Sequence, residues 1–85
     1  MYFIDWQSKA LKQLAKIPDQ STRKVLKDAV AGLAVFPNTP QVKKLTRHKY
    51  AYRLRVGRYR IFFDIADTIR IISIQEVKKR DDRTY

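Results

Sequence analysis

The order of apolar and polar residues first predicts a strand followed by two helices. Tyr2 to Asp5 is a short aromatic and β-branched run, which is typical of a strand. From Trp6 the apolar residues recur at helical spacing, and this helix should end before Pro18 because a residue that precedes proline disfavours the helical region. Asp19 or Ser21 can cap the second helix. The apolar stripes of the two helices comprise Trp6, Ala10, Leu11, Leu14 and Ile17, then Val25, Leu26, Ala29, Val30 and Leu33.

The second half of the chain changes to a period of two residues, which predicts strands. Gly57-Arg58 suits a two-residue type II′ turn, with glycine at its first central position. That turn fixes a hairpin register, in which Val56 pairs with Tyr59, Arg55 with Arg60, Leu54 with Ile61, and Arg53 with Phe62. The second strand of the hairpin runs from Tyr59 to Ile65. After a turn at Ala66-Asp67, the last strand runs from Ile69 to Val77, in a register that the sequence leaves open.

These elements predict an α+β fold of order β-α-α-β-β-β, with a helical hairpin packed on a twisted, mainly antiparallel sheet. A chain of 85 residues forms a single domain, residues 1–85. It contains no cysteine and one histidine, so disulfides, thiolate chemistry and multi-histidine metal sites are not expected. No apolar run approaches the ~20 residues that span a bilayer, and no signal peptide is evident. We therefore expect a cytoplasmic protein with no membrane partner.

Charge narrows the possible partners to anions. The chain has 19 Lys and Arg against 8 Asp and Glu, a net charge of +11, yet its 45% hydrophobic content is enough for a core. The acidic residues are scattered and show no metal-ligand spacing, so no metal and no cofactor are expected. The sequence thus favours binding of phosphate or of an acidic protein.

The basic residues concentrate between Val42 and Arg60, where eight occur with no acidic residue. A solvated basic face is the simplest interpretation of such a run. The predicted register argues against it for Arg55 and Arg60, because like charges directly opposed across a sheet are destabilising. An anion between these side chains would remove that penalty, and the planar fork of arginine suits a phosphate. Arg53 lies two residues along the same face and shares this anion-binding interpretation. For Lys43, Lys44, Arg47 and Lys49, generic attraction to a polyanion is the simpler role.

Two further features carry candidate chemistry. The polar segment from Lys78 to Tyr85 would ordinarily fray, but a terminal tyrosine can donate a proton or stack on a base. His48 is the one side chain of a type that changes charge between pH 5 and 8, and it lies in a basic loop where a bystander role is the simpler interpretation.

The element order, the run from Tyr52 to Ile65, and the ending Lys79-Arg80 followed by Tyr85 resemble the RelE/ParE superfamily of toxins from bacterial type II toxin-antitoxin modules. The resemblance implies a RelE-like microbial RNase fold. RelE-like members are mRNA interferases that cut mRNA in the ribosomal A site, using the 2′-hydroxyl as nucleophile and basic and tyrosine side chains instead of a metal. By position, the resemblance implies catalytic roles for Arg53, Arg55, Arg60, Arg80 and Tyr85. With such a function, the basic residues expected to bind RNA are Lys43, Lys44, Arg47, Lys49, Arg58 and Lys79.

This sequence departs from the RelE pattern in two ways. Arg53 and Arg55 stand where the family has lysines, and arginine can stabilise a phosphorane but is a poor general base. The base would then be Tyr85, His48, or a group of the RNA or ribosome. The spacing to Tyr85 is one residue shorter than in RelE, so Lys79 is the alternative to Arg80 as the family cation.

The resemblance also implies partners. These are the ribosome with its mRNA, and a cognate antitoxin whose acidic, amphipathic segment folds on the helical hairpin and the basic sheet face. Operator DNA would be bound only indirectly, through the antitoxin. ParE-like members offer an alternative function, because they poison DNA gyrase and are not nucleases. A basic nucleic-acid-binding module without catalysis is a third interpretation.

Overall fold

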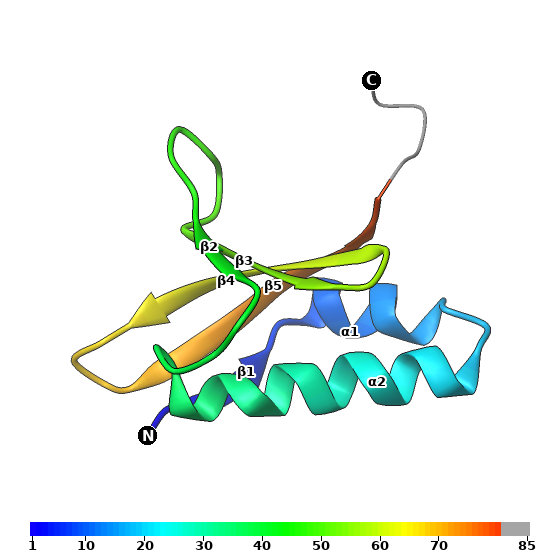
Figure 1. Ribbon diagram of the computed structural model, residues 1–85, viewed down its shortest axis with the longest axis horizontal. Helices are drawn as coiled ribbons and strands as arrows, with labels where there is room; N and C mark the ends of the chain where they lie inside the picture. The colour runs from blue at the N-terminus through cyan, green and yellow to red at the C-terminus, as the bar shows by residue number, and fades with distance from the viewer. Residues whose placement is uncertain (81–85) are drawn as a thin grey trace.

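The computed structural model describes residues 1–80, and within them two helices pack on one face of a five-stranded sheet (Figure 1). This confirms the predicted α+β fold and its helical hairpin. The elements in chain order are β1 (Phe3–Trp6), α1 (Ser8–Ala15), α2 (Gln20–Ala31), the 3-10 helix η1 (Gly32–Val35), β2 (Val42–Lys44), β3 (Tyr52–Val56), β4 (Tyr59–Ala66) and β5 (Ile71–Lys79). Tyr85, a predicted site residue, lies outside the described residues.

The sheet has the strand order β1-β5-β4-β3-β2, so the first strand enters beside the last. β1 runs parallel to β5, and the other neighbours are antiparallel. β2 is an addition to the predicted order. It has three residues, too few to show an alternating pattern, and it forms by pairing Val42 with Leu54 and Lys43 with Arg53.

The β3–β4 hairpin has the predicted register at every pair, including Arg55 opposite Arg60. Gly57 has a φ of 56°, whereas Arg58 does not have a positive φ. A positive φ at only the first central residue is the requirement of a type II′ turn, which glycine meets without steric cost. The turn that the sequence predicted therefore sets the alignment of the two arginines.

The β4–β5 connection differs from the prediction. It comprises residues 67–70, and β5 runs from Ile71 to Lys79, instead of from Ile69 to Val77. The hydroxyl of Tyr2 donates to Asp67, and the guanidinium of Arg70 lies 4.1 Å from the centre of the Tyr2 ring. These contacts with the N-terminal segment hold a four-residue turn, so the last strand begins and ends two residues later than predicted.

The first strand and helix also begin later than predicted. Trp6, assigned to the helix by its spacing, belongs to β1 because it pairs with Ile74 of β5. The backbone N–H of Gln7 also donates to the carbonyl of Ile74, and α1 starts after it. Pairing along β5 therefore decides where the helix begins. Asp19 caps α2 as predicted, accepting from the N–H of Ser21.

The core lies between the helices and the sheet. Leu26 and Val30 of α2, and Leu33 after it, are buried as predicted against Leu54, Ile61, Phe63, Ile72, Ile74 and Val77 of the sheet. Val25 and Leu11 were predicted to be buried, but they are 56% and 48% exposed. Their positions at the margin of each apolar stripe turn them away from the sheet. Within residues 1–80 no helix is long and apolar enough to cross a membrane.

The core contacts predict the effect of truncating Phe63, whose side chain is fully buried. Phe63→Ala should lower the free energy of unfolding by ~3–5 kcal/mol, because it loses apolar burial and leaves a cavity. Urea titration followed by far-UV circular dichroism measures this change. Val25→Ala is the matched control and should cost less than ~1 kcal/mol, since the side chain is already half exposed. Equal losses in the two variants would contradict the observed core.

Candidate functional site

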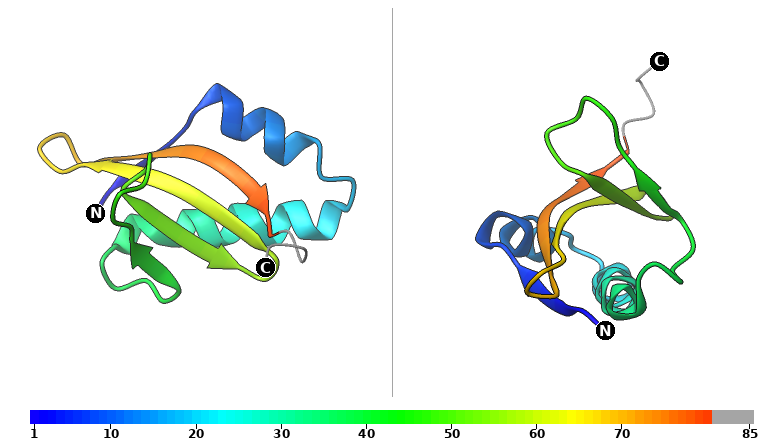
Figure 2. Two further views of the ribbon diagram at one scale, coloured as in Figure 1. Left: turned by 90° about the horizontal axis from the view of Figure 1, so that it is seen from above. Right: turned by 90° about the vertical axis from the view of Figure 1, so that its left-hand side faces the viewer.

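The sheet face opposite the helices, here called the open face, carries the predicted arginines. Figure 1 and the right-hand view of Figure 2 show that the β2–β3 loop rises from the sheet on this side, away from α1 and α2. Side chains of β3 alternate, so Leu54 enters the core while Arg53 and Arg55 lie on the open face. Arg60 shares this face because it is the cross-strand partner of Arg55.

Two rows of cations cross the open face. In one row Arg55, Arg60 and Lys78 occupy directly paired positions on β3, β4 and β5. In the other, Lys43 of β2 is paired with Arg53. Lys78 was missed in the sequence because the last strand was predicted to end at Val77. Alternation from the core residues Ile72 and Ile74 would have placed Lys78 on the helix side, and only the bulge at Gln75 turns it to the open face.

Among these cations, Arg53 has a buried guanidinium nitrogen. It is partly buried, and its Nε has no hydrogen-bond partner among the described residues. Burial, followed by the charges of Arg60 and Arg55, lowers the pKa of the Arg53 guanidinium. Within residues 1–80, no carboxylate forms an ion pair with Arg53, Arg55 or Arg60. The arrangement leaves N–H donors and positive charge available to an anion.

Glu76 is the buried acid among the described residues of this face, and its carboxylate already has hydrogen-bond and ion-pair partners. A bulge leaves Gln75 as the extra residue of β5, so Glu76 pairs with Phe62 at the edge of the sheet. The hydroxyl of Tyr50 donates to its carboxylate at 2.7 Å, and Gln13 Nε2 does so at 3.3 Å. Lys9 and Lys78 lie 3.3 and 3.7 Å away.

These contacts determine the protonation of Glu76 and Tyr50. Burial alone would raise the pKa of Glu76, but the hydrogen bonds from Tyr50, Gln13 and Lys9 and the charge of Lys78 outweigh it and lower that pKa to about 2. The same hydrogen bond, with burial, raises the pKa of the Tyr50 hydroxyl to about 12. Glu76 is thus a fixed carboxylate and Tyr50 a fixed donor, so neither is suited to transfer protons near pH 7.

The β2–β3 loop is tied down onto the open face. Besides the Tyr50–Glu76 bond, the N–H of Ala51 donates to Asp64 at 2.8 Å, and that of Leu45 donates to the carbonyl of Ala51 at 2.8 Å. The His48 ring stacks on Phe62, with centroids 5.0 Å apart and planes at 12°. The sequence did not reveal this stack, because it joins a loop residue to a strand that it does not pair with.

The remaining predicted residues divide between three places. Arg80 follows β5, and its N–H donates to the carbonyl of Arg58 in the hairpin turn at 2.6 Å. Arg47 and Lys49 belong to the β2–β3 loop. Lys44 and Lys79 lie on the helix side of the sheet, because they pair with Tyr52 and Tyr59, which pack against the core. The structure therefore does not bring Lys44 or Lys79 together with the arginines.

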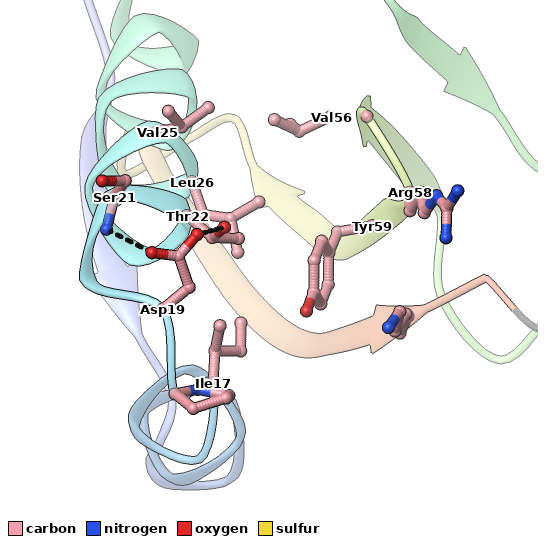
Figure 3. A pocket seen from close by; sticks show the side chains of 12 residues that line it. Ile17, Asp19, Ser21, Thr22, Val25, Leu26, Val56, Arg58 and Tyr59 are labelled. Carbon is pink, nitrogen blue, oxygen red and sulfur yellow. Dashed lines mark hydrogen bonds between the residues drawn. The ribbon is translucent and has the colours of Figure 1, made fainter.

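A groove of about 560 Å³ lies on the opposite side of the hairpin, between it and the start of α2 (Figure 3). Val25, Val56 and Tyr59 form part of its largely apolar lining. Arg58 and Lys79 line it from the hairpin turn and the end of β5, while the Asp19 carboxylate is engaged by Thr22 and Ser21 at the helix cap. The half-exposed Val25 thus has a place in this groove.

Solved structures place the fold among the RelE toxins. The isolated E. coli RelE toxin is 22% identical and has a TM-score of 0.80, with 99% of this chain and 89% of that chain covered. The toxin-antitoxin complex RelBE2 from Mycobacterium tuberculosis gives 27% identity and a TM-score of 0.73, with 93% of this chain and 98% of that chain covered. The archaeal RelE-RelB complex from Pyrococcus horikoshii gives 23% identity and a TM-score of 0.78, with 95% of this chain and 97% of that chain covered.

Sequence identifies the family more directly. Residues 4–83 match the model described as the ParE toxin of the type II toxin-antitoxin system parDE, and the chain belongs to this family, within the RelE/ParE superfamily. It is thus a toxin of a type II toxin-antitoxin system. No curated protein matches the chain in sequence.

The Glu76 contacts predict an acid-dependent loss of stability. Its pKa is about 2 in the folded protein, below its ordinary value of 4.5, so the unfolded chain binds more protons as the pH falls. The stabilisation is present above about pH 4.5 and is lost toward pH 2. Glu76→Gln should therefore lower the free energy of unfolding at pH 7 by ~1–3 kcal/mol and flatten its fall below pH 4.5, as measured by urea titration across that range.

The matched control is Asp28→Asn, which removes an exposed ion pair with Lys24. It should change the free energy of unfolding at pH 7 by less than ~1 kcal/mol. If the wild type and Glu76→Gln lost stability in parallel below pH 4.5, the role assigned to Glu76 would be wrong.

Proposed function

We propose that this toxin is a ribosome-dependent, metal-independent mRNA endonuclease that cuts mRNA in the ribosomal A site and thereby inhibits translation. The observation that carries the proposal is the row of Arg55, Arg60 and Lys78 beside the partly buried Arg53, whose Nε is unpartnered among the described residues. Like charges held this close lower stability unless an anion occupies the space between them. A phosphodiester of RNA supplies that anion.

The chemistry follows from what arginine can do. The RNA 2′-hydroxyl oxygen attacks the adjacent phosphorus while the bond from phosphorus to the 5′-oxygen breaks, leaving a 2′,3′-cyclic phosphate and a 5′-hydroxyl. Charge on the phosphoryl oxygens grows in the transition state, and Arg53, Arg55 and Arg60 stabilise it with their positive charge and N–H donors. The proton released from the 2′-hydroxyl and the one taken up by the 5′-oxygen pass through groups such as Tyr85 or those of the RNA and ribosome. Arg80 adds a further cation.

The matching family model is described as a ParE toxin, and this description favours a second candidate function. A ParE-like protein would inhibit DNA gyrase without cutting RNA. The arginine rows favour the nuclease, since they cluster on one face around an unpartnered guanidinium Nε instead of being spread over the surface. Primer extension on mRNA after induction separates the two: cuts within codons support the nuclease, and intact transcripts with an SOS response support gyrase inhibition.

The arginine rows predict the effect of removing the opposed pair. Arg55→Ala combined with Arg60→Ala should reduce mRNA cleavage on ribosomes with a defined A-site codon by ~100-fold or more, because both stabilise the transition state. Lys27→Ala on the exposed surface of α2 is the matched control and should cleave at the wild-type rate. Thermal melts establish that each variant is folded. Wild-type cleavage by the folded double variant would refute the site.

A cognate antitoxin with an acidic, amphipathic segment is the partner that we infer for the groove beside α2. Its apolar side would pack on Val25, Val56 and Tyr59, and its acidic side chains would pair with Arg58 and Lys79. The net charge of +11 would attract an acidic segment to this toxin. Five of the similar structures are complexes of a RelE toxin with an antitoxin. The operator would then be contacted by the antitoxin rather than by this chain.

The groove predicts a contrast between two exposed valines. Val25→Asp should weaken binding of the antitoxin encoded beside the toxin gene by about tenfold or more, because it places a charge against the apolar side of the partner. Val35→Asp, at a valine that is 53% exposed outside the groove lining, should bind as the wild type does. Isothermal titration calorimetry measures both. Equal affinity of Val25→Asp and wild type would exclude this groove as the docking site.

A further inference from the structure

His48 presents a flat ring above the open face. The imidazole lies almost parallel to the Phe62 ring, with centroids 5.0 Å apart, and Phe62 beneath it is 8% exposed. Phe62 packs on one face of the His48 ring, and the residue as a whole is exposed, so part of its surface is open to a ligand. Phe62 is the cross-strand partner of Arg53 and lies two residues from Arg60 on the same face. The exposed imidazole is therefore a close neighbour of the phosphate-binding cations.

The hydrogen bonding of His48 determines what its ring can offer. The N–H of Tyr50 donates to His48 Nδ1 at 3.0 Å, so Nδ1 is an acceptor and the neutral ring carries its proton on Nε2. Protonation of Nδ1 would set two donors against each other. Of the open alternatives for the general base, this geometry argues against His48, because its one lone pair is already used. The hydrogen bond from Tyr50 fixes the orientation of the aromatic plane.

The loop that carries His48 is also held in place. Tyr50, two residues after His48, is fixed by the short bond from its hydroxyl to Glu76, and Ala51 by the bond to Asp64. The charged groups nearest in the loop are cationic: Arg47, and Lys49, whose Nζ lies 5.4 Å from the centre of the Tyr50 ring. A flat ring, a fixed loop and surrounding positive charge together match single-stranded RNA, whose unpaired bases stack on aromatic side chains.

We propose that His48 stacks on one unpaired base of the mRNA, next to the phosphate held by Arg53 and Arg60. This assignment rests on the proposed nuclease function and deepens it, because it names a base-binding position that the arginines do not supply. Phosphate contacts orient the RNA without reading it, whereas a stacked base fixes which phosphate lies over the arginines. His48 is thus a positioning residue that touches the substrate and transfers no proton.

The test combines protein and RNA changes in one cleavage assay on programmed ribosomes. Each nucleotide of the A-site codon, and the nucleotide on either side of that codon, is replaced in turn by an abasic ribonucleotide. With intact mRNA, His48→Ala should slow cleavage by about tenfold. Loss of the base at one position should slow the wild type by a similar factor and leave the rate of His48→Ala unchanged. His48→Phe retains a ring and should keep both the wild-type rate, within about threefold, and the dependence on that base.

Lys49→Ala is the matched control from the same loop. It should slow cleavage of intact and abasic mRNA by the same factor, because an ammonium group attracts phosphates regardless of the base. Thermal melts check that the loop variants are folded, and His48→Phe covers the case in which loss of the ring disturbs Phe62.

The outcomes separate this inference from the function on which it rests. If the wild type cleaves and the Arg55→Ala, Arg60→Ala variant does not, but the effects of His48→Ala and base removal multiply at every position, the stacking role is wrong while the nuclease remains. The same holds if His48→Phe is as slow as His48→Ala. If the wild type cleaves no mRNA on ribosomes, the nuclease proposal itself fails, and the stacking role fails with it.

Discussion

The buried carboxylate of Glu76 is the interaction on which the arrangement of the open face depends. It accepts hydrogen bonds from Tyr50 of the β2–β3 loop and Gln13 of α1, and it attracts Lys9 and Lys78. Gln13 uses its other amide atom to accept from the N–H of Val77, on the edge of β5 beyond the end of its pairing with β1. One acid thus joins a helix, a loop and a strand. A buried charge is tolerated only with such partners, and here the partners are the elements that border the site.

The uneven distribution of charge explains why this small basic protein can fold. The residues of the apolar core lie on one side of the sheet, while Arg53, Arg55, Arg60 and Lys78 project from the other. Two features of the folded state lower its stability: the repulsion between Arg55, Arg60 and Lys78, and the Nε of Arg53, which has no hydrogen-bond partner within residues 1–80. Core burial offsets this cost. A bound phosphate would relieve that cost. The clustered cations that lower the stability of the free toxin are also the observation that supports the proposed nuclease function.

Strand alternation lets one hairpin serve two surfaces. Val56 and Tyr59 line the apolar groove beside α2, while their neighbours Arg55 and Arg60 lie on the open face. The inferred antitoxin segment and the substrate would therefore contact opposite sides of the same two strands. The position of Lys79 on the groove side follows from this alternation, and it leaves Lys78 as the cation that shares a row with the arginines.

The sequence by itself determined the hairpin, because Gly57 requires a single turn type and a turn of two residues permits a single register. Arg55 and Arg60 were therefore found together before any tertiary contact was known. The tertiary structure decided what depends on distant partners. β2 forms only by pairing with β3, β5 shifts because Tyr2 holds the 67–70 turn, and Phe62 meets His48 only because Tyr50 reaches Glu76. Local chemistry thus fixed the pairing of Arg55 with Arg60, whereas contacts between residues far apart in the chain placed the His48 loop beside it.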